Sequence, residues 1–118
     1  MKNCPVKNKY HARKCTVDGV VYDSRKEAAR GQELRMLEKL GLISDLNFQV
    51  PFLLQNNFIY AGHKLRKIEY IADAVYKENG KLVVEDTKSF VTRKNPVYRV
   101  KIKLLLFRYP DIVFRENL

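Results

Sequence analysis

A two-residue motif near the middle of the chain, Asn79-Gly80, constrains the fold more than any other feature. Asn-Gly is the strongest short signal for a tight β-turn, and here it separates two strand-like stretches, Glu69 to Lys77 and Lys81 to Lys88. We therefore predict an antiparallel hairpin in which Glu78 faces Lys81. Every other pair of opposed residues follows from that register.

The predicted register places Asp73 directly opposite Asp86, on the same face of the hairpin. Directly opposed side chains have Cβ atoms about 5 Å apart, so two carboxylates there repel each other. Both acids interrupt apolar runs, where an uncompensated charge is costly. Because side chains alternate along a strand, Lys88 shares the face of Asp86. It would neutralise one carboxylate in an ordinary ion pair and leave the other protonated or pointing to solvent. A divalent cation between the acids is the second interpretation, and it accounts for both the repulsion and the burial.

Oxygen ligands of this kind favour Mg²⁺ or Mn²⁺. The metal ligands that we expect are Asp73 and Asp86, with the carbonyl of Thr87 as a further oxygen. Glu33 is a candidate fourth ligand, because it falls on or beside the apolar stripe of the preceding helix. A solvated position at the edge of that stripe is the equal alternative for Glu33. Two cysteines and two histidines lack the paired spacing of a zinc site, so we expect the thiols to be incidental.

The remaining patterns predict one α/β (α+β) domain in the order α, β, β, β, α, β behind a small amino-terminal hairpin. The hairpin turns at Asp18-Gly19, and Ser24 has the form of a helix cap. Pro51 suggests that its strand lies at an edge or contains a bulge. The expected segments are a hairpin from 16 to 22, a helix from 24 to 40, strands at 46–54, 69–77, 81–88 and 111–116, and a helix from 96 to 108. Residues 58–60 look like the start of a return strand that the polar segment 62–67 interrupts.

Charge indicates the class of partner. Lysine and arginine total 23 against 13 acids, which gives a formal net charge of +10. Such an excess on a short chain predicts binding to a polyanion, and nucleic acid is the commonest one in a cytoplasm, which is the compartment we expect. No apolar run approaches the ~18 residues of a membrane span, and no basic amphipathic helix suggests a membrane surface.

The cations gather in two acid-free stretches. We predict a basic arm at residues 1–15, followed by a single domain at residues 16–118. Within them, the expected nucleic-acid-binding residues come from the arm and from the second helix with its approach: Lys9, Arg13, Lys14, Arg93, Lys94, Tyr98, Arg99, Lys101 and Lys103. Contacts of this kind hold the phosphate backbone without reading sequence.

An acid on one strand, an acid-x-lysine on its antiparallel partner and the predicted order of elements resemble the core of the PD-(D/E)XK nuclease superfamily. Tyr70-Ile-Ala-Asp73, Val84-Glu-Asp-Thr-Lys88 and Lys101-Ile-Lys103-Leu before Tyr109-Pro110 are more similar still to a family of small phage and prophage proteins placed in it. The resemblance covers nearly the whole chain. It implies a restriction-endonuclease-like core, with a mixed central sheet flanked by two helices.

By that resemblance, Asp73 is the first acid, Asp86 and Lys88 form the (D/E)-x-K element, and Glu33 matches the helix acid of many members. The implied activity is metal-dependent hydrolysis of DNA phosphodiester bonds, directed by structure in the manner of a Holliday-junction resolvase, in phage DNA metabolism. Ser89 departs from the family, which usually has glycine there. A homodimer on branched or duplex DNA fits this interpretation. An inactive DNA-binding or packaging accessory with the same fold is the alternative, and an RNA-directed protein is a third.

Overall fold

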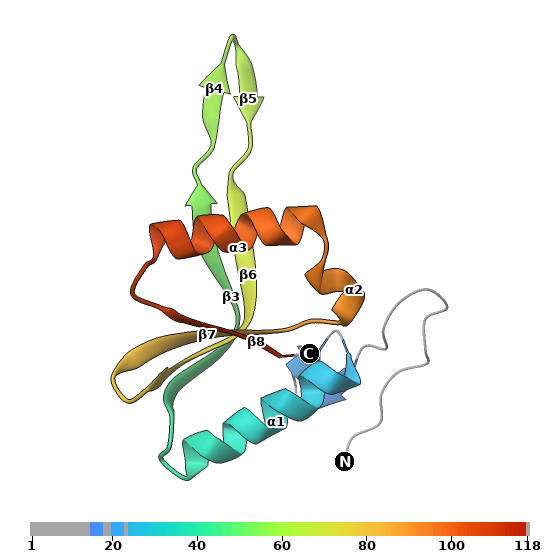
Figure 1. The fold of residues 1–118 in the computed structure, drawn as a ribbon, viewed down its shortest axis with the longest axis vertical. Helices are drawn as coiled ribbons and strands as arrows, with labels where there is room; N and C mark the ends of the chain where they lie inside the picture. Colours follow the sequence, from blue (N-terminus) through green and yellow to red (C-terminus); the bar gives the residue numbers. More distant parts are fainter. Residues whose placement is uncertain (1–14, 18–19, 23, 118) are drawn as a thin grey trace. The chain divides into compact units, whose positions relative to one another are not determined.

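The computed structural model describes residues 15–17, 20–22 and 24–117 (Figure 1). The chain divides into two compact units, Met1–Ile43 and Ser44–Leu118. The predicted arm, apart from Cys15, and the predicted Asp18-Gly19 turn lie outside the described residues. The division into a basic arm and one domain therefore stays a prediction.

The first unit contains the predicted hairpin and helix. Strands β1 and β2 pair antiparallel with Val17 opposite Val20, as expected for a two-residue turn between them. The helix begins where the sequence predicts, because the Ser24 side chain accepts a hydrogen bond from the backbone N–H of Glu27. It ends before Gly41, whose φ of 77° suits a glycine. The elements are β1 (Cys15–Val17), β2 (Val20–Tyr22) and α1 (Arg25–Lys39).

The second unit is built on a four-stranded sheet in the order β3-β6-β7-β8. The first three strands pair antiparallel and β8 pairs parallel to β7, so the sheet is mixed, and the predicted α/β class is confirmed. No helix among the described residues is both long and apolar enough to cross a bilayer. The elements are β3 (Ser44–Gln55), β4 (Phe58–Tyr60), β5 (His63–Leu65), β6 (Ile68–Glu78), β7 (Lys81–Thr87), α2 (Phe90–Arg93), α3 (Pro96–Arg108) and β8 (Val113–Asn117).

The register of the central hairpin is as predicted. Glu78 pairs with Lys81, and the ladder continues back to Ala74 opposite Glu85. Asn79 and Gly80 have φ values of 53° and 77°, the positive values that a type I′ turn requires. The strand that contains Pro51 is at the edge of the sheet, also as predicted.

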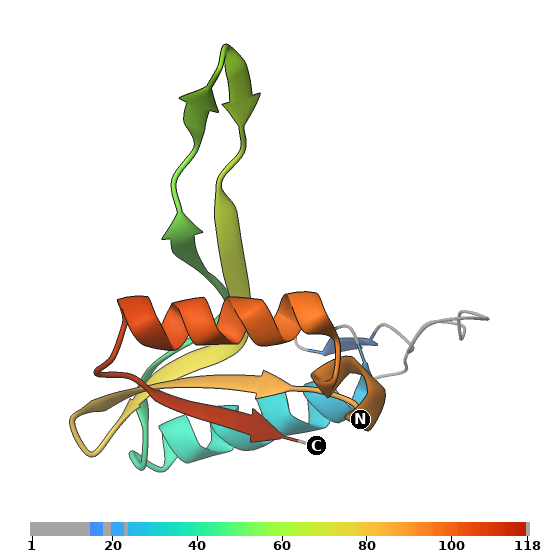
Figure 2. The same ribbon diagram turned by 45° about the horizontal axis from the view of Figure 1, so that its top comes forward.

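The segment after β3 differs from the prediction. Strands β4 and β5 form a separate two-stranded ribbon with Tyr60 opposite His63, so residues 62–67 do not interrupt a strand but contain one. Figures 1 and 2 show this ribbon extending away from the four-stranded sheet of its own unit. The turn is Ala61-Gly62, and Ala61 has a φ of 49°. Alanine seldom adopts positive φ because its Cβ approaches the carbonyl oxygen, so Ala61 did not indicate a turn.

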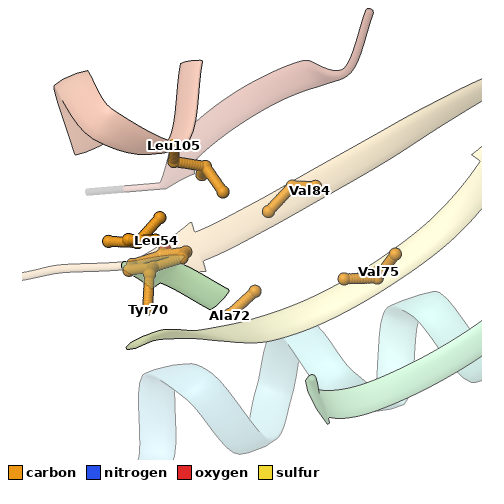
Figure 3. Packing of buried hydrophobic residues seen from close by; sticks show 6 residues of the cluster. All are labelled: Leu54, Tyr70, Ala72, Val75, Val84 and Leu105. Carbon is orange, nitrogen blue, oxygen red and sulfur yellow. The ribbon is translucent and has the colours of Figure 1, made fainter. Parts of the chain in front are cut away.

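The core of the second unit lies between the sheet and α3. Leu105 of the helix, with no exposed surface, packs against Leu54, Tyr70, Ala72, Val75 and Val84 of three strands (Figure 3). The helix starts at a proline, and the Asn95 side chain caps it by accepting from two backbone N–H groups. At the other end, the Tyr109 hydroxyl donates to the carbonyl of Leu53 at 3.0 Å. Both ends of α3 are therefore fixed.

Replacing Leu105 with alanine should lower the free energy of unfolding by about 2 to 5 kcal/mol, because it leaves a cavity in a core that relaxes only in part. Leu106→Ala is the matched control, since its neighbouring side chain is 42% exposed and should cost less than about 1 kcal/mol. Urea unfolding followed by circular dichroism measures both. Equal losses for the two variants would contradict the packing described for α3.

Candidate functional site

A buried carboxylate lies at the centre of the candidate site. Asp86, near the end of β7, has no exposed surface. Its Oδ2 accepts a hydrogen bond from the Tyr70 hydroxyl at 2.5 Å and lies 3.3 Å from the Lys88 ammonium. Its Oδ1 is equally buried and has no hydrogen-bond donor among the described residues. One oxygen of this carboxylate is therefore well satisfied and the other needs a partner.

Asp73 approaches the same place from β6. Its Oδ2 accepts a hydrogen bond from the backbone N–H of Thr87 at 2.8 Å, which joins the two strands beyond their last ladder pair. Its carboxyl also interacts with that of Asp86 and raises the pKa of Asp86. The structure thus brings together the two acids that the hairpin register placed opposite each other.

Strand β6 is irregular at Asp73. The buried cluster includes Tyr70 and Ala72 before it but Val75 after it, so the residues that face the core change from even to odd numbers at this point. On β3, Gln49 occupies the register position opposite Asp73 and has a φ of 53°. This change of phase explains how the Tyr70 hydroxyl reaches Asp86, since strict alternation would direct Tyr70 and Asp73 to opposite faces.

Lys88 is held by both its backbone and its side chain. Its N–H donates to the carbonyl of Asn117 in β8 at 2.8 Å. Its ammonium lies 5.0 Å from the centre of the Tyr98 ring, which attracts a cation through its negative face. The Tyr98 hydroxyl donates to Glu116, and Glu116 also pairs with Arg93 at 2.8 Å. Strand β8 and helix α3 therefore position the lysine beside Asp86.

The electrostatics of the site reflect its burial. Burial raises the pKa of the Asp86 carboxyl to about 8, and the facing Asp73 carboxyl adds to the increase. The Tyr70 hydrogen bond and the Lys88 charge act in the opposite direction without cancelling it. Burial also raises the pKa values of the Tyr70 and Tyr98 hydroxyls, so both remain hydrogen-bond donors at neutral pH.

These residues fit a small divalent cation. Two facing carboxylates, one with a buried oxygen that lacks a donor, are oxygen ligands that a cation would satisfy. Mg²⁺ commonly uses one or two protein carboxylates and fills its other positions with water or phosphate. Among the described residues, no group of three or more His, Cys, Asp or Glu side chains is arranged to hold a metal. Asp73 and Asp86 thus face each other as a pair, and their role as metal ligands stays a prediction.

Most of the predicted nucleic-acid-binding residues line one cleft of about 570 Å³ next to Lys88. The cleft includes Glu116 and the predicted Arg93, Lys94, Tyr98, Arg99 and Lys103. Lys101 lies instead in a second, mainly apolar groove beside α3. Lys9, Arg13 and Lys14 lie outside the described residues. Five of the nine predicted residues thus lie together in one cleft, and their role in binding stays a prediction.

Glu33 belongs to the first unit. Its side chain is 63% exposed and pairs with Arg30 at 3.4 Å, within one turn of α1. The buried residues of this helix include Ala28, Gly31 and Leu34, so the predicted stripe through Ala29 and Glu33 was wrong by one position. The arrangement supports the solvated-edge interpretation, and a role for Glu33 as a ligand stays a prediction. Thr87 contributes its N–H to Asp73, while its carbonyl stays a predicted ligand.

Two residues of the site were missing from the sequence analysis. Tyr70 was missed because strict alternation from Asp73 would direct it to the other face, and the irregularity at Asp73 leaves no mark in an apolar strand. Glu116 lies opposite Asp86 in the parallel pairing of β7 and β8. The sequence predicted the strand that contains Glu116 but did not predict that this strand pairs with β7. Had that pairing been predicted, it would have placed Glu116 beside Asp86.

Residues 7–116 match the family described as protein of unknown function (DUF1064), and because this is most of its length, the chain belongs to that family. No curated protein matches the chain, and neither does any solved structure.

The pKa of Asp86 predicts how stability depends on pH in the absence of metal. The folded value of about 8 exceeds the ordinary 3.8, so the protonated acid stabilises the fold below about pH 4, and this stability is lost as pH rises through 8. Asp86→Asn should therefore be more stable than the parent chain at about pH 9, by a few kcal/mol, and less dependent on pH. Urea unfolding in EDTA between about pH 5 and pH 9 measures this; identical pH profiles would contradict the prediction.

Added metal should stabilise the folded parent chain near pH 8, where loss of the Asp86 proton otherwise lowers its stability. Mn²⁺ near pH 8 should raise its melting temperature by about 5 °C or more, because the ion binds the folded state only. Asp73→Asn should show little change, while Asp111→Asn, an exposed aspartate outside the site, should respond like the parent chain. Differential scanning calorimetry with and without Mn²⁺ provides the comparison. An equal increase in Asp73→Asn would place the ion elsewhere.

Proposed function

We propose that this member of the DUF1064 family is a metal-dependent endonuclease that hydrolyses DNA phosphodiester bonds, with the core of the PD-(D/E)XK superfamily and Mg²⁺ or Mn²⁺ as its cofactor. The observation that carries the proposal is the buried Asp86, which has an oxygen without a donor and both Asp73 and Lys88 beside it. A structural ion pair with one of the two carboxyls protonated is the alternative, and metal binding distinguishes the two.

The chain's own groups have distinct tasks in this reaction. Asp73 and Asp86 would hold the cation, and a bound divalent cation supplies charge at the phosphate and a lower pKa for water. Lys88 offers three N–H donors at a point fixed by Asp86 and the Tyr98 ring. It would orient the attacking water and stabilise charge that develops on phosphate oxygen. Tyr70 keeps Asp86 in place by donating to the oxygen that Lys88 shares.

The cleft beside Lys88 would hold the substrate backbone. Its cations lie on α2, α3 and the residues between them, so they form one anion-binding wall. Backbone contacts of this kind carry no sequence information, and we propose that the enzyme selects DNA by structure, with branched DNA as its substrate. A cytoplasmic setting, phage DNA metabolism and a homodimer are parts of the same proposal.

An inactive DNA-binding accessory is the second candidate. The observation in its favour is that the described part of the second unit presents two facing carboxylates and no third acid in metal-ligating position. Such a protein would bind DNA through the same cleft without cutting it.

Cleavage assays separate the two candidates. Purified protein with Mg²⁺ or Mn²⁺ should cut four-way or linear DNA, and EDTA should prevent cutting. Asp86→Asn and Lys88→Ala should each reduce the rate by about 10²-fold or more, because each removes a group that acts on the transition state. Glu85→Gln is the matched control: it alters the neighbouring buried carboxylate, whose Oε1 bonds to Tyr76 on β6, and should change the rate less than about threefold.

DNA binding without cleavage on any substrate would support the accessory protein. A preference for RNA over matched DNA would contradict both candidates. Circular dichroism must show that every variant is folded at the assay temperature.

A further inference from the structure

The β4–β5 ribbon leaves apolar side chains in solvent. Ile59 and Tyr60 are 68% and 71% exposed, and Phe58 and Leu65 are also exposed. An isolated two-stranded hairpin is only marginally stable in water, so a ribbon of this kind gains stability from a partner. Figures 1 and 2 show no other element of the second unit against it.

The two faces of the ribbon differ in chemistry. Phe58 pairs with Leu65 and Tyr60 with His63, and because side chains alternate, these four share one face. The pair between them, Ile59 and Lys64, lies on the other face. One face is therefore aromatic and apolar, and the other carries a cation.

Charge indicates what this ribbon binds. Residues 46–68 contain no acid, while Lys64, Arg66 and Lys67 follow one another closely at the ribbon and its base. Within the described residues, neither Lys64 nor Arg66 forms an ion pair, whereas Lys67 pairs with Glu69 at 3.5 Å. Packing two such ribbons from two copies of the chain would bring like charges together, which opposes self-association. A polyanion is complementary to the same surface.

The dimensions of a two-stranded ribbon favour duplex DNA over duplex RNA as the polyanion. The major groove of B-form DNA, about 12 Å wide, admits a two-stranded β-ribbon. The major groove of duplex RNA is deep and narrow and does not admit side chains in this way. Exposed apolar side chains on such arms contact bases and sugars inside a groove, while flanking cations contact phosphates.

The base of the ribbon continues into the mainly apolar groove beside α3, which two lysines and Glu69 border. Lys67 lines this groove of about 500 Å³ together with Lys101 of α3, the predicted nucleic-acid contact that lies away from the main cleft. Cations thus extend from the ribbon to the helix that also borders the candidate site. This continuity within one unit allows a single duplex to contact both.

We propose that the β4–β5 ribbon is an arm that enters a groove of duplex DNA, with Lys64 and Arg66 at phosphates and Phe58 and Tyr60, which share one face, against the groove floor. The proposal deepens the proposed function and rests on it for the identity of the polymer. It concerns binding alone, so it is tested in the absence of cleavage.

The test uses the full chain, a fluorescent 30-base-pair duplex and EDTA, with anisotropy as the readout. Lys64→Glu combined with Arg66→Glu should weaken binding about tenfold or more and reduce the salt dependence by about two phosphate contacts. Lys26→Glu combined with Lys39→Glu, at exposed positions on α1, changes the net charge equally and should weaken binding less than about threefold. Tyr60→Ala should weaken binding to duplex without altering the salt dependence, because it removes no charge.

Each other outcome overturns the proposal in a distinguishable way. If the two double variants bind equally, the ribbon makes no specific contact, while duplex binding by the parent chain leaves the proposed function intact. If the parent chain binds no DNA, both proposals fail. If Tyr60→Ala changes a dimer into a monomer by analytical ultracentrifugation and leaves duplex affinity unchanged, the ribbon is a contact between two copies. A preference for duplex RNA also contradicts the groove argument.

Discussion

The cost of burying the Asp86 carboxylate determines the arrangement of the groups around it. A carboxyl group with no exposed surface in an apolar sheet requires partners, and the fold provides two to its Oδ2, a tyrosine on β6 and a lysine after β7, while the Asp73 carboxyl lies beside it. The irregularity of β6 brings Tyr70 within reach, and β8 fixes the backbone of Lys88. Replacing Asp86 with an apolar residue would remove the reason for each of these features.

Turn residues and helix-capping residues were sufficient to predict most of the fold from the sequence. The Asn79-Gly80 turn fixed the register of β6 and β7, and the Ser24 and Asn95 caps fixed the starts of the two long helices. The turn at Ala61-Gly62 was not predictable in this way, because Ala61 has a positive φ that alanine seldom adopts. The short helix α2 was missed for a similar reason, since four residues carry too little periodicity to reveal a helix.

The candidate site likewise contains residues that local sequence patterns predict and residues that they do not. Asp73, Asp86 and Lys88 follow from one hairpin register and the alternation of side chains, so their proximity was predictable. Tyr70 and Glu116 depend on a phase change within a strand and on a parallel pairing between strands that are distant in sequence. The position of Glu33 depends on which face α1 buries, and an error of one residue in the apolar stripe was enough to misplace it.

The parallel strand β8 has a consequence for how the site is acquired during synthesis. The hairpin that carries both aspartates is complete before α3 and β8 are made, and the backbone bond from Lys88 to Asn117 forms only with β8. Chains fold from the amino terminus as they emerge, so a nascent chain contains the acid pair while its lysine is still unanchored. The candidate site is therefore complete only once β8 has paired with β7, and such non-local pairings form slowly.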